Sequence, residues 1–134
     1  MKVFFDTNVL VYAQQNGAKA DRARALLAGG GKLSVQVLNE FTAVSRCKLG
    51  KDWREIAEAI DDALVLVEPP PALTLDLHAA ARALAETHRL SFYDALIIAA
   101  AIEAGCDTLY SEDMQHGQVV GALRIQSPFV ESPP

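Results

Sequence analysis

The sequence is poor in cysteine and has no long apolar run, and each shortage removes a class of protein. Its two cysteines, Cys47 and Cys106, lack metal-motif spacing, so we expect two reduced structural thiols. No apolar stretch approaches the roughly 20 residues that cross a bilayer. The opening run, residues 1–5, is broken by Asp6 and is too short for a signal peptide. We therefore expect a cytoplasmic protein.

Positive charge is also scarce. The 134 residues contain 12 Lys and Arg against 17 Asp and Glu, which gives a formal net charge of −5. Non-specific affinity for nucleic acid comes from basic side chains that neutralise phosphates. The charge balance therefore argues against a protein that slides along duplex DNA. It favours a weak or selective binder, or one that acts as an oligomer.

What the sequence does contain is an alternation of short apolar runs and helical patterns. Its length and its 51% hydrophobic residues predict a single domain, residues 1–134. Strands are predicted at 2–5, 33–35, 64–67, 108–110 and 123–125. Helices are predicted at 7–14, 19–28, 36–49, 52–63, 74–88 and 92–104, with Trp53 facing the core. This order predicts an α/β fold, with a central parallel sheet of about five strands and helices on both faces.

Four acidic residues fall near the carboxyl ends of predicted strands or at the starts of the helices that follow. Ligands gather at that edge of open α/β sheets. Taken singly, each acid has an ordinary explanation: Asp6 as a helix cap, Asp94 as part of a capping box with Ser91, Glu40 as a surface residue and Asp113 as a turn residue. Their joint placement at one edge favours a shared site.

Such a cluster needs a counter-charge. Two carboxylates about 5 Å apart repel by about 3 kcal/mol at an effective dielectric constant near 20, and a whole domain is stable by only about 5–15 kcal/mol. The acids must therefore protonate, separate or bind a cation. Oxygen ligands select Mg²⁺ or Mn²⁺ over zinc. Because such ions activate water and shield phosphate, the sequence favours phosphodiester hydrolysis.

Four ordered segments around these acids carry recognisable motifs: VFFDTNVL at residues 3–10, SVQVLNEF at 34–41, SFYDALI at 91–97 and LYSED at 109–113. Together they resemble the PIN-domain nucleases, and specifically the VapC-type toxins of bacterial toxin–antitoxin pairs. The resemblance covers nearly the whole chain. It departs after Asp113, where many relatives have a basic and then an aromatic residue and this chain has Met114, Gln115 and His116.

The resemblance implies a PIN-like three-layer fold and endoribonuclease activity with Mg²⁺ or Mn²⁺. It also implies a homodimer and inhibition by a cognate antitoxin. The metal ligands that it implies are Asp6, Glu40, Asp94 and Asp113, with Asn8 and Ser111 supporting the site or the substrate. Glu112 is the alternative to Asp113. The sequence leaves open which RNA is cleaved and whether one or two ions bind.

The densest basic run flanks Gly50 and consists of Arg46, Lys48, Lys51 and Arg54. We interpret this run, with Lys48 and Lys51 as its substrate-binding residues, as an RNA-contacting edge. A solvated helix end explains it equally well.

Two other functions are compatible with the pattern. The first is a non-catalytic PIN-like binding module, against which the presence of all four acids argues. The second is phosphotransfer through an aspartyl-phosphate at Asp6. Enzymes of that kind usually have a second acid two residues later, whereas this chain has Asn8 there.

Overall fold

The structure is a computed structural model that describes residues 1–130, so the predicted domain end at residue 134 lies outside the described part. Along the chain the elements are β1 (Val3–Phe5), α1 (Thr7–Ala13), α2 (Ala18–Ala28), α3 (Val35–Cys47), α4 (Trp53–Leu66), α5 (Leu75–His88), α6 (Phe92–Glu103), β2 (Thr108–Tyr110), β3 (Val119–Val120) and β4 (Leu123–Gln126).

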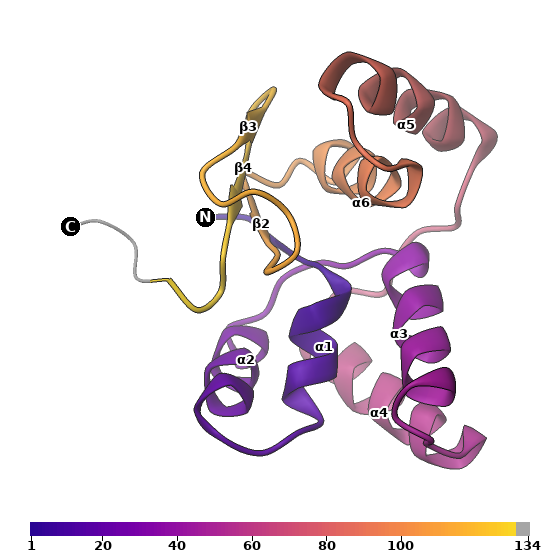
Figure 1. The fold of residues 1–134 in the computed structure, drawn as a ribbon, viewed down its shortest axis with the longest axis vertical. Coiled ribbons are helices and arrows are strands. Elements are labelled where there is room, and N and C mark those ends of the chain that lie inside the picture. Colours follow the sequence, from indigo (N-terminus) through magenta and orange to yellow (C-terminus); the bar gives the residue numbers. More distant parts are fainter. Residues whose placement is uncertain (131–134) are drawn as a thin grey trace.

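A four-stranded sheet joins two groups of helices. Its strand order is β1-β2-β4-β3, with β1, β2 and β4 parallel and β3 antiparallel at the edge. In Figure 1, α5 and α6 lie together above, α1 to α4 lie below, and the sheet stands to the left. The predicted α/β class is confirmed. Because β1 and β2 are parallel neighbours, the segments that follow them emerge at the same edge.

Two of the predicted strands are wrong. At residues 64–67 the chain is still helical as far as Leu66. A capping box between Asp52 and Glu55 stabilises the start of α4, and buried residues recur at helical spacing along it as far as Ala63. At residues 33–35 no strand forms: the isolated bridge to Phe4 is made by Lys32, the residue before, and Ser34 already caps α3. The edge strand β3 was not predicted, since two residues are too short to show a pattern.

Trp53 is also not where the sequence placed it. It is the first residue of α4 and its side chain is 63% exposed. The guanidinium of Arg46 lies 5.1 Å from the centre of its ring. The buried face of α4 is formed instead by Ile56, Ala59 and Ala63. An apolar side chain in a first turn has no preceding turn to fix its face, which is why the prediction failed here.

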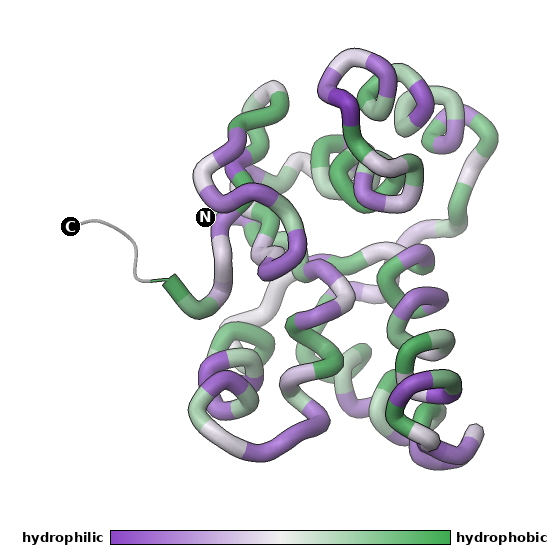
Figure 2. The backbone as a smooth tube through the Cα atoms, in the orientation of Figure 1, coloured by the Kyte–Doolittle hydropathy of each residue, from purple (hydrophilic) through white to green (hydrophobic). Residues whose placement is uncertain are grey.

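The core fixes the strand ends that carry the acids. Phe4, Phe5 and Leu109 are at most 1% exposed, and Phe5 stacks on Tyr110 at 6.2 Å between ring centres. A smaller cluster joins α5 to α6, and in Figure 2 most of α6 is green. Both cysteines are free, with Cys106 buried and Cys47 exposed. Within residues 1–130, no helix has the length and apolar character needed to span a membrane.

We expect the substitution Gly31→Ala to destabilise the protein by about 1–3 kcal/mol. Gly31 has φ +152°, and a Cβ added there would lie 2.6 Å from Cε2 of Phe5 and 2.9 Å from the carbonyl oxygen of Val3. The matched control is Gly29→Ala, because Gly29 has φ −74° and its nearest atom would be 3.4 Å away. Urea unfolding measures both. Equal midpoints for the two variants would contradict the close packing of Gly31 on β1.

Candidate active site

Asp6 lies at the junction of β1 and α1 and is only 5% exposed. Its backbone N–H extends the sheet by donating to the Tyr110 carbonyl at 3.0 Å. Its side chain caps α1: Oδ1 accepts from the N–H of Thr7 at 2.7 Å, and Oδ2 accepts from the hydroxyl of Ser111 at 2.6 Å. Asp6 is thus both a helix cap and a fixed carboxylate at the carboxyl ends of β1 and β2.

Glu40 reaches the same place from α3. Its Oε2 accepts a hydrogen bond from the hydroxyl of Thr7 at 3.1 Å. Thr7 therefore contacts both acids, through its N–H to Asp6 and through its hydroxyl to Glu40. The Ser34 cap sets the start of α3, which places the half-buried Glu40 in its second turn.

Asp113 comes from the loop after β2, and Asn8 on α1 holds it. The Asn8 amide donates from Nδ2 to Asp113 Oδ2 at 3.3 Å, while its Oδ1 accepts from the N–H of Glu112 at 3.3 Å. The side chain of Glu112 turns instead to Tyr12 and Lys19. Of the two candidates for the fourth acid, Asp113 is therefore the one whose contacts lie among the other acids.

Asp94 lies in the first turn of α6, where its backbone N–H donates to the Ser91 hydroxyl at 3.3 Å. Its charge, like that of Asp113, raises the pKa of both Asp6 and Glu40. Because such effects need close approach, the four acids form one electrostatic cluster. Of the capping box predicted for Ser91 and Asp94, only the half made by the Asp94 N–H forms within residues 1–130, because no return bond joins the Ser91 N–H to the Asp94 carboxylate.

Burial is the main cause of the altered acidity in this cluster. It raises the pKa of Asp6, although the hydrogen bonds from Ser111 and Thr7 act in the opposite direction. Burial likewise raises the pKa of Glu40, with Thr7 opposing it. Removal from water disfavours the ionised form, and neighbouring carboxylates add to that effect. The ionised carboxylates of Asp6 and Glu40 would therefore be stabilised by a positive charge placed beside them.

The donor chemistry fits a hard divalent cation. All four side chains offer carboxylate oxygens, and an ionised carboxylate retains lone pairs beyond those used by one hydrogen bond. As the side chains stand within residues 1–130, no group of three or more acids, histidines or cysteines already has the arrangement of a metal centre. Asp6, Glu40 and Asp113 instead accept hydrogen bonds from Thr7, Ser111 and Asn8.

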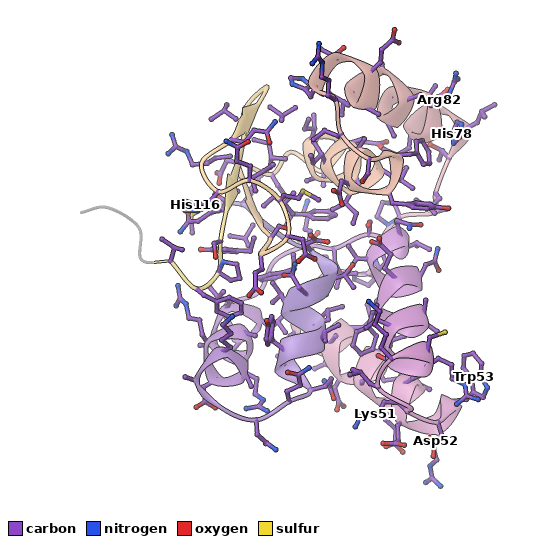
Figure 3. The ribbon with its side chains drawn as sticks, in the orientation of Figure 1. Lys51, Asp52, Trp53, His78, Arg82 and His116 are labelled. Carbon is purple, nitrogen blue, oxygen red and sulfur yellow. The ribbon has the colours of Figure 1, made fainter. Side chains whose placement is uncertain are left out.

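The basic run lies elsewhere. Lys48 follows Glu40 by eight residues at the end of α3, which is about 12 Å along a helix. In Figure 3, Lys51 and Trp53 lie at the end of the α3–α4 pair that is farthest from the sheet. Lys51 pairs with Glu55 at 3.8 Å and Arg54 pairs with Glu58 at 3.2 Å. The structure therefore does not bring Lys48 and Lys51 to the acids.

Sequence reasoning missed Thr7, Tyr12 and Lys19. Thr7 directly follows Asp6, and Tyr12 lies four residues after Asn8, hence on the same face of α1. Both signals are present in the sequence but are common in helices that have no active site. Nothing local marks Lys19, whose contact with Glu112 spans 93 residues.

Known proteins share this architecture. The sequence model of the PIN domain family matches residues 3–121. VapC20 of Mycobacterium tuberculosis, a toxin that cleaves the sarcin-ricin loop, is 24% identical with a TM-score of 0.66, over 84% of this chain and 90% of that one. A chain of VapBC2 from Rickettsia felis, bound to a DNA fragment from its promoter, is 22% identical with a TM-score of 0.67. The match covers 95% of this chain and 98% of that one. No curated protein matches the sequence.

In metal-free protein at pH 7, we expect Asp6→Asn to raise the melting temperature. Burial raises the pKa of Asp6 in the folded state, so its contribution to stability is lost as the pH rises through that pKa. Asparagine carries no charge and keeps an acceptor for the Thr7 N–H. The gain should therefore shrink as the pH is lowered and the wild-type carboxyl becomes protonated. Calorimetric scans at several pH values measure it.

The matched control for this experiment is Asp107→Asn. Hydrogen bonds from Thr108 and Lys2 lower the pKa of the Asp107 carboxyl, so this substitution should lower the melting temperature at pH 7. A lower melting temperature for Asp6→Asn as well would show that the contacts from Thr7 and Ser111 outweigh the cost of burial.

Proposed function

Because this chain belongs to the PIN domain family, we propose that it is a metal-dependent endoribonuclease and the toxin of a VapBC-type toxin–antitoxin pair. One observation carries the proposal: Asp6, Glu40, Asp94 and Asp113 come from four separate segments, yet Asp94 and Asp113 lie near enough for their charges to add to the burial that raises the pKa of Asp6 and Glu40. A fold that needed no ion would gain nothing from bringing these charges together.

In the proposed enzyme, Asp6, Glu40, Asp94 and Asp113 hold Mg²⁺ or Mn²⁺. A bound divalent ion lowers the pKa of water and screens the negative charge of a phosphodiester. The polar side chains of α1 and β2 prepare this site. Ser111 and Thr7 fix the two oxygens of Asp6, Thr7 orients Glu40, and Asn8 orients Asp113. In this proposal the main role of Asn8 and Ser111 is to hold the acids in place. Of the two, the half-buried Asn8 is the one within reach of substrate.

No side chain of the cluster is suited to form a covalent intermediate. Ser111 is fully buried and its hydroxyl donates a hydrogen bond to Asp6. Asp6 itself is 5% exposed with both oxygens engaged, which argues against an aspartyl-phosphate. Hydrolysis by activated water is the mechanism that these positions support.

The biological setting is proposed from the family and the resemblance together. The substrate class would be RNA, which is what the Mycobacterium tuberculosis neighbour cleaves. The partner would be a cognate antitoxin, by analogy with the VapBC2 complex. A homodimer and a cytoplasmic location are the remaining parts of this proposal. Co-expression with the product of an adjacent reading frame, followed by a growth assay, tests the antitoxin.

We expect Asp94→Asn to reduce Mn²⁺-dependent RNA cleavage by about a hundredfold or more, equivalent to about 3 kcal/mol of activation free energy. The substitution removes one charged ligand and leaves the Ser91 cap intact, because that cap binds the backbone N–H. The control is Asp76→Asn, which changes an acid in the first turn of α5, outside the cluster. Full activity of Asp94→Asn, or of wild type in excess chelator, would reject the mechanism.

Calorimetric titration separates this enzyme from a non-catalytic binding module. Wild-type protein should bind Mn²⁺ and gain melting temperature with increasing metal concentration, since a ligand that binds only the folded state stabilises it. A scaffold without metal chemistry would show neither effect.

For the proposed RNA-contacting edge, we expect Lys48→Glu and Lys51→Glu to raise KM severalfold without changing kcat, and to weaken the salt dependence of KM. Lys48 should have the larger effect, because it has no ion-pair partner in the described part of the chain, whereas Lys51 pairs with Glu55. Arg82→Glu on α5 serves as a control for net charge. An unchanged KM and salt dependence would assign this run to a solvated helix end.

A further inference from the structure

The side chain of Glu112, next to Asp113, is held from several directions. The hydroxyl of Tyr12 donates to its Oε1 at 2.9 Å, and Nζ of Lys19 donates to its Oε2 at 3.3 Å. Phe129 packs edge-on against Tyr12 at 4.9 Å between ring centres. We call Tyr12, Lys19, Glu112 and Phe129 the Glu112 clamp. None of the other three contacts any of the four acids of the site.

Lys19 connects the parts of the clamp. Its ammonium lies 5.2 Å from the centre of the Tyr12 ring and 4.9 Å from that of Phe129, in the range of cation–π attraction. It also neutralises Glu112, the acid nearest in sequence to Asp113. Without that pairing, a fifth carboxylate would be free to approach a cluster that already carries excess negative charge.

The C-terminal segment completes the clamp. Nε of Arg22 on α2 donates to the carbonyl oxygen of Pro128 at 3.1 Å, and Pro128 is almost fully buried. The N–H of Phe129 donates to the hydroxyl of Ser127 at 3.3 Å. The segment that follows β4 is thereby fixed across α1 and α2, which places the Phe129 ring against Tyr12 and beneath Lys19.

One face of α1 binds two consecutive residues of the loop after β2. Asn8 accepts from the N–H of Glu112 and donates to Asp113, and Tyr12, one turn later, binds the Glu112 side chain. On the other side of the loop, Met114 donates its N–H to the buried Ser111 hydroxyl. Because Glu112 and Met114 are held on either side, neighbouring contacts limit the freedom of the backbone at residue 113 and add to the bond that Asp113 itself accepts from Asn8.

We propose that Tyr12, Lys19 and Phe129 are positioning residues of the metal site, which set its affinity by holding the Glu112 side chain away from the four acids while Asp113 stays beside them. The proposal rests on the metal-binding function proposed above. It predicts that a hydroxyl and a ring outside the acid cluster control the binding of the ion, and that the C-terminal segment takes part in that control.

The test is calorimetric titration of the full chain with Mn²⁺ alone. Tyr12→Phe removes one hydroxyl, and Phe129→Leu removes the ring that contacts Tyr12 and Lys19. Each should raise the Kd for Mn²⁺ by about threefold to tenfold. This is at or below the low end of the loss in metal affinity that follows removal of an outer-shell partner. The control is Tyr110→Phe, whose hydroxyl has no hydrogen bond among residues 1–130, and which should leave the Kd unchanged.

A double-mutant cycle distinguishes positioning from a general loss of stability. If Tyr12 acts through Glu112, Glu112→Ala weakens Mn²⁺ binding to a similar extent, and adding Tyr12→Phe to it has no further effect. A wild-type Kd for Tyr12→Phe, or additive losses in the double variant, would overturn the inference while leaving the proposed nuclease intact. Absence of Mn²⁺ binding by the wild type would overturn both.

Discussion

The hydrogen bond from Ser111 to Asp6 is the contact on which the rest of the site depends. It joins the residues that directly follow two parallel neighbouring strands, at 2.6 Å and out of contact with water. A buried carboxylate is costly unless its oxygens are satisfied, and here a hydroxyl and a helix N-terminus satisfy them. Thr7, Asn8 and the loop to Met114 take their positions from this junction, and the remaining acids are arranged around it.

Much of this arrangement could be predicted from the sequence. Asp6, Glu40, Asp94 and Asp113 each lie beside a strand end or a helix start, and those features have clear local signatures. The α/β alternation was readable for the same reason. The strand predicted at residues 64–67 failed because an apolar run of alternating Leu and Val also suits the end of a helix whose start is capped at Asp52. Short-range pattern alone does not separate the two structures.

The parts that escaped prediction depend on distant contacts. The ring of Trp53 is exposed and lies next to Arg46 on a different helix, and the role of Lys19 follows from a loop 93 residues away. The basic run drew attention because of its density. The structure shows that Lys51 and Arg54 pair with acids of α4, and that the run lies far from the cluster.

The parallel pairing of β1 with β2 has a consequence for synthesis of the chain. The bond between Asp6 and Ser111 spans 105 residues, and the contact of Tyr12 with Phe129 lies still nearer the C-terminus. An α1 segment that has just left the ribosome has neither Asp94 nor the loop that carries Asp113. If the chain is a ribonuclease, the ribosome that makes it is therefore not exposed to an assembled nuclease until the loop that carries Asp113 has been translated. Any partner that must restrain the enzyme then has the duration of translation in which to accumulate.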